Sequence, residues 1–339
     1  MGSEMCIRDR YINMNKIFLT LTVAALAGTA CSQSETKNIT PKPTLQKAHV
    51  ETEVSADKLF GAYLNAGQDT PIIVIVPGSG PTDRDSNNGN MKSNALKFLA
   101  QGLADNDISS IRVDKRGMFA SHKAGDANAV TVDIYADDYR RWALKAIELS
   151  GQDCAYLLGH SEGGLMVTAA ALGQDNICGV VTVAAAGRPM SDVLREQLKS
   201  NPANAFIMKD AEGAITALEK GERVDVSDFN VALKPLFYPA VQDFLISIFA
   251  VDPAEMLSRL TVPSLVIQGE HDIQVSVEDG QRLAEKSGAK LVLIPKMNHV
   301  LKPAPKNKIA NALSYNSPNK PIDAAVTEAV AEFVEANEK

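Results

Sequence analysis

The chain has 339 residues, of which 45% are apolar and 22% charged, an ordinary globular composition with enough length for one large domain that carries an insertion. A net charge of −7 at pH 7, without any cluster of Lys and Arg, argues against a nucleic-acid-binding surface. The four cysteines lack the paired short spacings of a zinc site, so we expect no metal.

The amino-terminal segment has the layout of a secretory signal. Residues 1–13 resemble a translated sequencing adapter, so we expect the protein to begin at Met14. Lys16 precedes an uncharged apolar run over residues 17–27, and small residues follow just before Cys31. The apolar run is too short for a permanent membrane-spanning helix, which needs about 20 residues. Residues 14–30 are therefore predicted to be a signal peptide and the protein to be exported.

This segment also resembles a bacterial lipoprotein signal, in which Cys31 would be the lipidated residue. Lipoproteins usually carry a larger aliphatic residue where Gly28 stands, so simple secretion remains the alternative. The resemblance implies a periplasmic or membrane-anchored protein of a bacterium, with membrane contact only through a lipid on Cys31. Residues 31–47 are polar and rich in Ser, Thr, Lys and Pro, which predicts a flexible tether before a folded domain over residues 48–339.

The remaining chain alternates strand and helix patterns. Alternating stretches near residues 50–54 and 59–64 predict an antiparallel hairpin. Strands buried on both faces are predicted from almost wholly apolar runs at 71–76, 108–113, 155–158, 180–184, 263–267 and 291–294. Helical patterns lie near 93–105, 132–149, 163–172, 277–286 and 323–336. This order predicts an α/β fold, with a mostly parallel eight-stranded sheet covered by helices on both faces.

Residues 188–260 interrupt the alternation, because they hold helical patterns and no convincing strand. We interpret them as a helical cap inserted after the sixth strand. Its apolar residues could form an acyl pocket or could serve the cap's own packing. They are the stretches 205–208 and 236–238, with Phe244 and Phe249.

A G-x-S-x-G pattern spans residues 159–163, between a predicted buried strand and a predicted helix, which is where a nucleophile elbow lies. The turn is so tight that side chains at Gly159 and Gly163 would collide with neighbouring backbone. Ser161 is therefore the candidate nucleophile, and the first amides of the helix favour a developing negative charge. The alternative interpretation is a Gly-rich turn with a hydrogen-bonded serine.

A serine nucleophile needs a base, and His299 is the candidate among five histidines because it follows the last predicted strand. That position opens at the same sheet edge as Ser161, since parallel strands end there together. His160 and His271 each adjoin another candidate residue and are expected to point elsewhere. Asp272, after the preceding strand, is the preferred carboxylate to orient His299, with Glu270 as the alternative. The three residues occur along the chain in the order Ser, Asp, His, which is the order found where the nucleophile lies on an elbow after a strand of a parallel sheet.

The oxyanion hole is predicted from the loop Pro77-Gly78-Ser79-Gly80-Pro81 that follows the strand over 71–76. Small residues there let the backbone approach a substrate. We assign the amides of Ser79 and Glu162 to the hole, with Gly80 as the alternative to Ser79. A simple Gly-Pro turn is the other interpretation.

The elbow, the Gly-Ser-Gly-Pro loop with Asp83-Arg84-Asp85, the stretch Asp114-Lys115-Arg116-Gly117 and the two late loops together resemble bacterial α/β-hydrolases of the esterase and serine-aminopeptidase-like group. The resemblance covers residues from about 50 to the end. It implies a triad serine hydrolase without metal or organic cofactor that acts on acyl esters or, in some members, on peptides. We predict a carboxylesterase that cleaves a small-molecule ester through an acyl-enzyme on Ser161. Many relatives carry His where Pro77 stands and Val-Gly where Met118-Phe119 stand, which bears on pocket shape.

Two alternatives accompany the carboxylesterase prediction. An exported aminopeptidase of the same fold would need carboxylates to hold a substrate amino group, and Glu212, Glu219 and Glu222 in the cap are candidates. A non-catalytic binding protein would keep the fold without turnover.

Cys154 begins the strand that leads to Ser161, and Cys178 lies just before the next predicted strand. The family fold implies that these strands are neighbours, so the two cysteines could form a disulfide or could remain as two buried thiols. The acyl chain length, the alcohol and the oligomeric state do not follow from the sequence.

Overall fold

The computed structural model describes residues 50–338. The predicted adapter segment, the signal peptide, the lipidation residue Cys31 and the whole predicted tether lie outside these residues.

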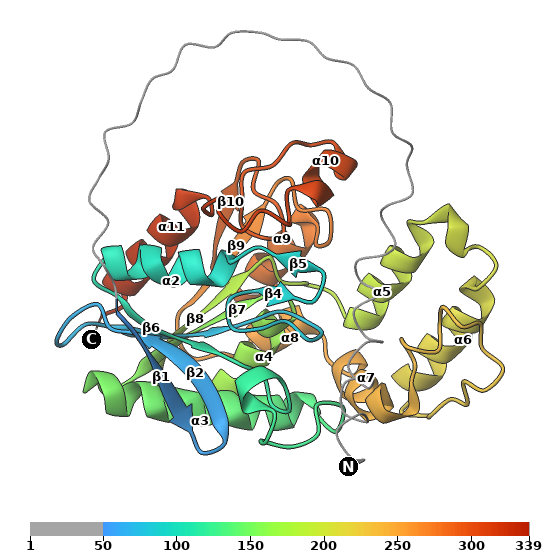
Figure 1. The fold of residues 1–339 in the computed structure, drawn as a ribbon, viewed down its shortest axis with the longest axis horizontal. Helices are drawn as coiled ribbons and strands as arrows, with labels where there is room; N and C mark the ends of the chain where they lie inside the picture. The colour runs from blue at the N-terminus through green and yellow to red at the C-terminus, as the bar shows by residue number, and fades with distance from the viewer. Residues whose placement is uncertain (1–49, 339) are drawn as a thin grey trace, which may run out of the picture.

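The predicted mostly parallel eight-stranded sheet is confirmed (Figure 1). In spatial order the strands are β1 (Glu51–Ala56), β2 (Leu59–Leu64), β6 (Ser109–Val113), β3 (Ile72–Val76), β7 (Ala155–His160), β8 (Ile177–Val183), β9 (Ser264–Gly269) and β10 (Lys290–Ile294). Strands β1 and β2 form the expected antiparallel hairpin, and β2 also pairs antiparallel with β6. All other neighbours in this sheet are parallel.

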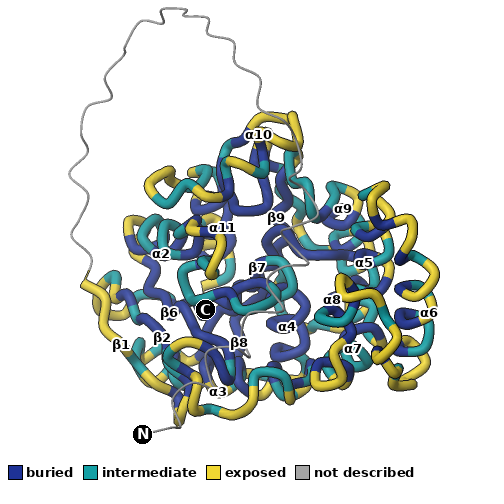
Figure 2. Tube along the Cα trace, turned by 45° about the vertical axis from the view of Figure 1, so that its right-hand side comes forward, coloured by how far each residue is buried: buried dark blue, intermediate teal, exposed yellow. Residues whose placement is uncertain are grey.

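Helices cover both faces of the sheet, as predicted. Helices α2 (Ala95–Asp105) and α11 (Ala324–Ala336) pack together on one face, while α3 (Val132–Ser150), α4 (Glu162–Ala171) and α9 (Val277–Ser287) lie on the other (Figure 1). Successive residues of a strand enter different cores: Val74 packs with α3 and α4, and Ile75 packs with α2. The central strands are buried along their whole length (Figure 2), which explains why their sequences are continuously apolar.

The segment between β8 and β9 is helical and stands beside the sheet (Figure 1). It comprises α5 (Met190–Lys199), α6 (Met208–Glu219), α7 (Gln242–Phe249) and α8 (Pro253–Leu257), with short 3-10 turns before α6 and α7. Both ends of this segment, which we call the cap, are tied to α9: Arg188 pairs with Asp279 at 2.9 Å, and Arg282 pairs with Asp252. The cap is thereby fixed over the carboxyl ends of the central strands.

Two small elements escaped the sequence analysis. A hairpin of two-residue strands, β4 (Asn87–Asn88) and β5 (Met91–Lys92), precedes α2, and α10 (Lys308–Leu313) follows β10. Both are too short for a hydrophobic period to show. The structure also joins Cys154 and Cys178 in a disulfide at the amino ends of β7 and β8.

Candidate active site

Ser161 lies at the sharp turn between β7 and α4, with φ 55° and ψ −125°. A non-glycine residue in the left-handed region is strained, and the surroundings hold it there. A Cβ on Gly159 would lie 2.1 Å from the Gly163 carbonyl oxygen, and one on Gly163 would lie 2.7 Å from the carbonyls of Val76 and Pro77. The two glycines therefore permit the tight packing that presents Ser161 above the sheet.

The structure brings Asp272 and His299 together. The Nδ1 of His299 lies 2.8 Å from an Asp272 carboxylate oxygen, and both side chains are buried. The other Asp272 oxygen accepts the amides of Gln274 and Val275 at 2.8 and 3.0 Å. Asp272 is thus held rigidly and fixes the ring of His299 with Nδ1 occupied. Glu270, the alternative carboxylate, is exposed.

His160, next to the nucleophile, contacts the His299 segment, contrary to the expectation that it points elsewhere. Its ring lies 4.9 Å from the His299 ring, and its Nε2 is 2.7 Å from the His299 carbonyl oxygen. Burial, and then the proximity of His299, lowers the pKa of His160 to about 4, so it stays neutral and donates this bond. The expectation for His160 was wrong because its hydrogen-bond partner, the carbonyl of His299, lies 139 residues away in the sequence.

The Ser161 hydroxyl makes no hydrogen bond to any residue between 50 and 338, so the bond to His299 is open in this structure. Catalytic hydrogen bonds are often open in unliganded enzymes and tighten when substrate binds. His160 links the two segments, because it adjoins Ser161 in the chain and is bonded to the backbone of His299.

The loop after β3 lies against Ser161, since a Cβ on Gly78 would be 3.1 Å from the Ser161 Cβ. Lys115 holds this loop: its Nζ donates to the carbonyls of Gly78 and Gly80 at 2.6 and 2.5 Å. These carbonyls flank Ser79, one of the two predicted oxyanion residues, and the other, Glu162, begins α4. Neither Ser79 nor Glu162 donates its amide to an acceptor in the described part of the chain.

The three side chains of the stretch 114–116 face different partners. Asp114 accepts from Arg84, Arg116 pairs with Asp138, and only Lys115 reaches the loop beside Ser161. Burial lowers the pKa of Lys115 to about 8.

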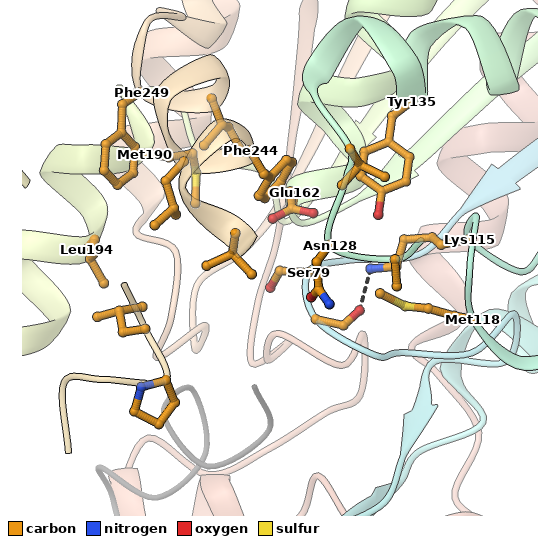
Figure 3. Close-up of a pocket in the computed structure, with 18 of the residues that line it drawn as sticks. Ser79, Lys115, Met118, Asn128, Tyr135, Glu162, Met190, Leu194, Phe244 and Phe249 are labelled. Carbon is orange, nitrogen blue, oxygen red and sulfur yellow. Dashed lines mark hydrogen bonds between the residues drawn. The ribbon is translucent and has the colours of Figure 1, made fainter. Parts of the chain in front are cut away.

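A cavity lies between the cap and the body of the domain (Figure 3). The cavity is partly open to solvent. Ser79, Gly80 and Glu162 line it, so it begins at the predicted oxyanion hole. Most of the wall is apolar and comes from α5, α7 and the segment before α7, including Met190, Leu194, Leu236, Phe244, Ile248 and Phe249.

The cavity has a polar end on the side of the domain body. Figure 3 shows Glu162, Tyr135, Lys115 and Asn128 on that side, opposite Leu194 and Phe249. Burial raises the pKa values of the Glu162 carboxyl and of the Tyr135 hydroxyl, while the Lys115 cation acts to lower that of Glu162. No periodic pattern in the sequence could place Tyr135 here, because it reaches the cavity from α3.

Some of the apolar cap residues named in the sequence analysis line the cavity, and others do not. Leu236, Phe244 and Phe249 line the cavity, whereas Phe237 is buried against Phe229. Phe206 and Tyr238 are exposed by 72% and 57% and take no part in the cavity.

The cap glutamates considered for an aminopeptidase are placed elsewhere. Arg195 on α5 binds Glu212 at 2.9 Å and Glu219 at 2.5 Å, both on α6, and thereby joins the two helices. Neither of these residues nor Glu222 lines the cavity. Glu162 is the carboxylate that does.

Residues 50–338 contain no group of three or more His, Cys, Asp or Glu side chains placed to hold a metal ion. No helix in the same range is both long and apolar enough to cross a membrane.

Comparison with known proteins connects this arrangement to hydrolases. Residues 88–220 match the family of serine aminopeptidases, S33. The chain is 29% identical over 236 residues to Esterase EstD of Thermotoga maritima, a match covering 68% of this chain and 54% of that protein. The chain thus spans about half the length of this curated relative.

Solved structures resemble the whole domain. Est1E from Butyrivibrio proteoclasticus with bound ferulic acid aligns with a TM-score of 0.55 and 18% identity, over 84% of this chain and 98% of that one. An esterase from Pyrococcus furiosus aligns with a TM-score of 0.54 and 14% identity, over 86% of this chain and 92% of that one. At these identities the likeness is one of fold.

Proposed function

We propose that this chain, which has the α/β-hydrolase fold, is a carboxylesterase that cleaves small-molecule esters through an acyl-enzyme on Ser161. The observation that carries the proposal is the Asp272–His299 pair, which lies beside the strained elbow that carries Ser161. The esterase among its relatives in sequence supports the choice of an ester.

In the proposed reaction, the Nε2 of His299 takes the proton of the Ser161 hydroxyl as the oxygen attacks the ester carbonyl. Asp272 keeps Nδ1 occupied, so only Nε2 is free to act as the base. The amides of Ser79 and Glu162 stabilise the negative charge that develops on the carbonyl oxygen. His299 then protonates the leaving alcohol, and a water activated by the same ring releases the acid.

His160 supports this reaction without sharing its protons. With a pKa near 4, its ring stays neutral at physiological pH and donates to the His299 carbonyl. The two rings therefore do not compete for the serine proton, and the bond holds the His299 backbone close to the elbow.

The aminopeptidase of the same fold is the second candidate, because residues 88–220 match that family. The matched range includes Ser161 but neither Asp272 nor His299. Its candidate residues in the cap, Glu212 and Glu219, are both bound by Arg195 and lie away from the cavity. These contacts favour the esterase.

We test the choice with two chromogenic substrates on the full chain, p-nitrophenyl butyrate and leucine p-nitroanilide. An esterase releases p-nitrophenol from the first and leaves the second intact, and Ser161→Ala abolishes the release. Cleavage of the anilide without cleavage of the ester would identify the aminopeptidase. Cleavage of neither, with no labelling of Ser161, would identify the non-catalytic alternative.

We further propose that the protein is exported and anchored through a lipid on Cys31. The disulfide between Cys154 and Cys178 supports export, because such bonds persist in oxidising compartments. Mass spectrometry of the mature amino terminus tests this proposal: a diacylated cysteine is expected at position 31, and an intact peptide spanning residues 16–37 contradicts cleavage.

A further inference from the structure

We propose that the cavity beside Ser161 selects esters that carry a hydroxyl group, which Glu162 and Tyr135 bind while the cap covers the apolar remainder of the substrate. This inference rests on the proposed esterase function and adds the substrate class. It starts from the cavity's two unlike ends, an extensive apolar wall and a small polar group beside the oxyanion hole (Figure 3).

Two of the polar groups at this end, the Glu162 carboxyl and the Tyr135 hydroxyl, form no hydrogen bond with residues 50–338. Both residues line the cavity, and neither group is among the fully buried unpaired atoms, so solvent can reach them when the cavity is empty. A polar group that is desolvated without a partner typically costs about 1–3 kcal/mol. A ligand that covers the two groups without bonding to them meets that cost, and a ligand that bonds to them avoids it.

Such a site discriminates more strongly than an apolar pocket does. A pocket that hydrogen-bonds a substrate hydroxyl rejects an analogue without it, because its own polar groups would stay unpaired. Here an apolar group alone would fill the walls formed by Phe244 and Phe249 and leave Glu162 and Tyr135 unpaired.

The charges favour a hydroxyl over an ammonium group. Lys115 lines the same cavity and its cation offsets the Glu162 carboxylate, so the pair carries no net charge when both are ionised. An ammonium group would meet the Lys115 cation at this end. A hydroxyl can donate to Glu162 and accept from Tyr135, which matches both groups without adding charge.

Matched esters test the preference on the full chain. The acyl series consists of p-nitrophenyl hexanoate, its 3-hydroxy and 6-hydroxy derivatives and its 6-amino derivative. The alcohol series compares hexyl butyrate with 6-hydroxyhexyl butyrate. We expect kcat/KM to rise about tenfold or more for a hydroxylated ester over its parent in one series, and the series that responds identifies which side of the ester occupies the cavity.

Variants assign the preference to the two residues. Tyr135→Phe and Glu162→Leu should each lower the ratio of hydroxylated to parent kcat/KM by about fivefold or more. Tyr139→Phe is the matched control, since Tyr139 stacks on Tyr135 at 6.0 Å and its buried hydroxyl is unpaired, yet it does not line the cavity. The control should keep the wild-type ratio.

Three results would overturn the inference: no hydroxylated ester exceeds its parent, the preference survives in both variants, or the amino ester exceeds the hydroxyl esters. The first two leave the esterase intact, because the parent esters are still hydrolysed. Failure to hydrolyse any ester, including the parents, is instead a failure of the proposed function.

Discussion

Replacing Lys115 by Met should slow catalysis far more than it weakens the fold. Lys115 donates to the carbonyls on both sides of Ser79, so its loss releases the loop that we propose supplies an oxyanion donor. Removing one such donor costs about a hundred- to a thousand-fold in turnover, and a misplacement of about 1 Å costs about a hundredfold. We expect kcat to fall about a hundredfold with KM changed less than about threefold.

The expected effect on stability is smaller because two contributions oppose each other. Met leaves the Gly78 and Gly80 carbonyls unpaired, at about 1–3 kcal/mol each. It also removes a buried cation whose pKa has fallen from 10.5 to about 8, a burial penalty of about 3 kcal/mol at neutral pH. The net change in unfolding free energy should lie within about 3 kcal/mol.

The pH dependence distinguishes this role from a merely structural one. Lys115 loses its proton as pH rises through about 8 and becomes a weaker donor, so wild-type kcat should fall above that pH. The folded pKa lies below the unfolded value, so the burial penalty of the Lys115 cation is complete below about pH 8 and disappears as pH rises to about 10.5. Alkaline pH should therefore lower activity while it removes this penalty on stability.

Initial rates of p-nitrophenyl butyrate hydrolysis between pH 6 and 10, with denaturant unfolding at the same pH values, provide the assay. Lys302→Met is the matched control, because Lys302 is also buried, donates to Ser93 and Ser317 carbonyls and has a pKa of about 8, but does not bond to the oxyanion loop. The control should keep the alkaline fall in kcat. An unchanged kcat in Lys115→Met, or the same alkaline fall in that variant, would refute the reasoning.

Two further variants and reduction of the disulfide test the site and its support. Asp272→Asn should lower kcat by about 10⁴ with native circular dichroism, since His299 would no longer be held in the required tautomer; a loss under tenfold would remove Asp272 from the triad. Reducing the Cys154–Cys178 disulfide, which closes a loop of 24 residues, should lower the unfolding free energy by about 3 kcal/mol in urea titrations with and without reductant, and identical midpoints would contradict this. Gly159→Ala should abolish soluble expression, because its Cβ would lie 2.1 Å from a carbonyl oxygen of α4, and a soluble, active variant would show that the elbow is not so constrained.

The fold followed from the sequence because its strands are buried on both faces. The runs that became β3, β7 and β8 are almost wholly apolar. A parallel sheet with helices on both faces then follows from the alternation of strands and helices along the chain. The β4–β5 hairpin was missed because strands of two residues have no measurable period.

The candidate site was predictable only where local sequence determines position. Ser161 is fixed by the glycines around it, and Asp272 and His299 by their places after strands. The side chains of Tyr135 and Glu162 belong to helices whose patterns describe packing, and their convergence on one cavity depends on how the cap sits against α3.

The cap glutamates illustrate the same limit. A charged residue on a helix is available to a substrate only if no partner has bound it, and Arg195 binds both Glu212 and Glu219. That pairing depends on the docking of α5 against α6, which the sequence does not reveal.

Labelling of the full chain with a fluorophosphonate probe, followed by peptide mass spectrometry, tests most directly whether Ser161 is an activated nucleophile. We predict stoichiometric modification of the peptide that contains Ser161, and strongly slowed labelling in His299→Ala. An unmodified Ser161 in folded protein, or equal labelling rates in the two proteins, would contradict the proposed catalytic triad.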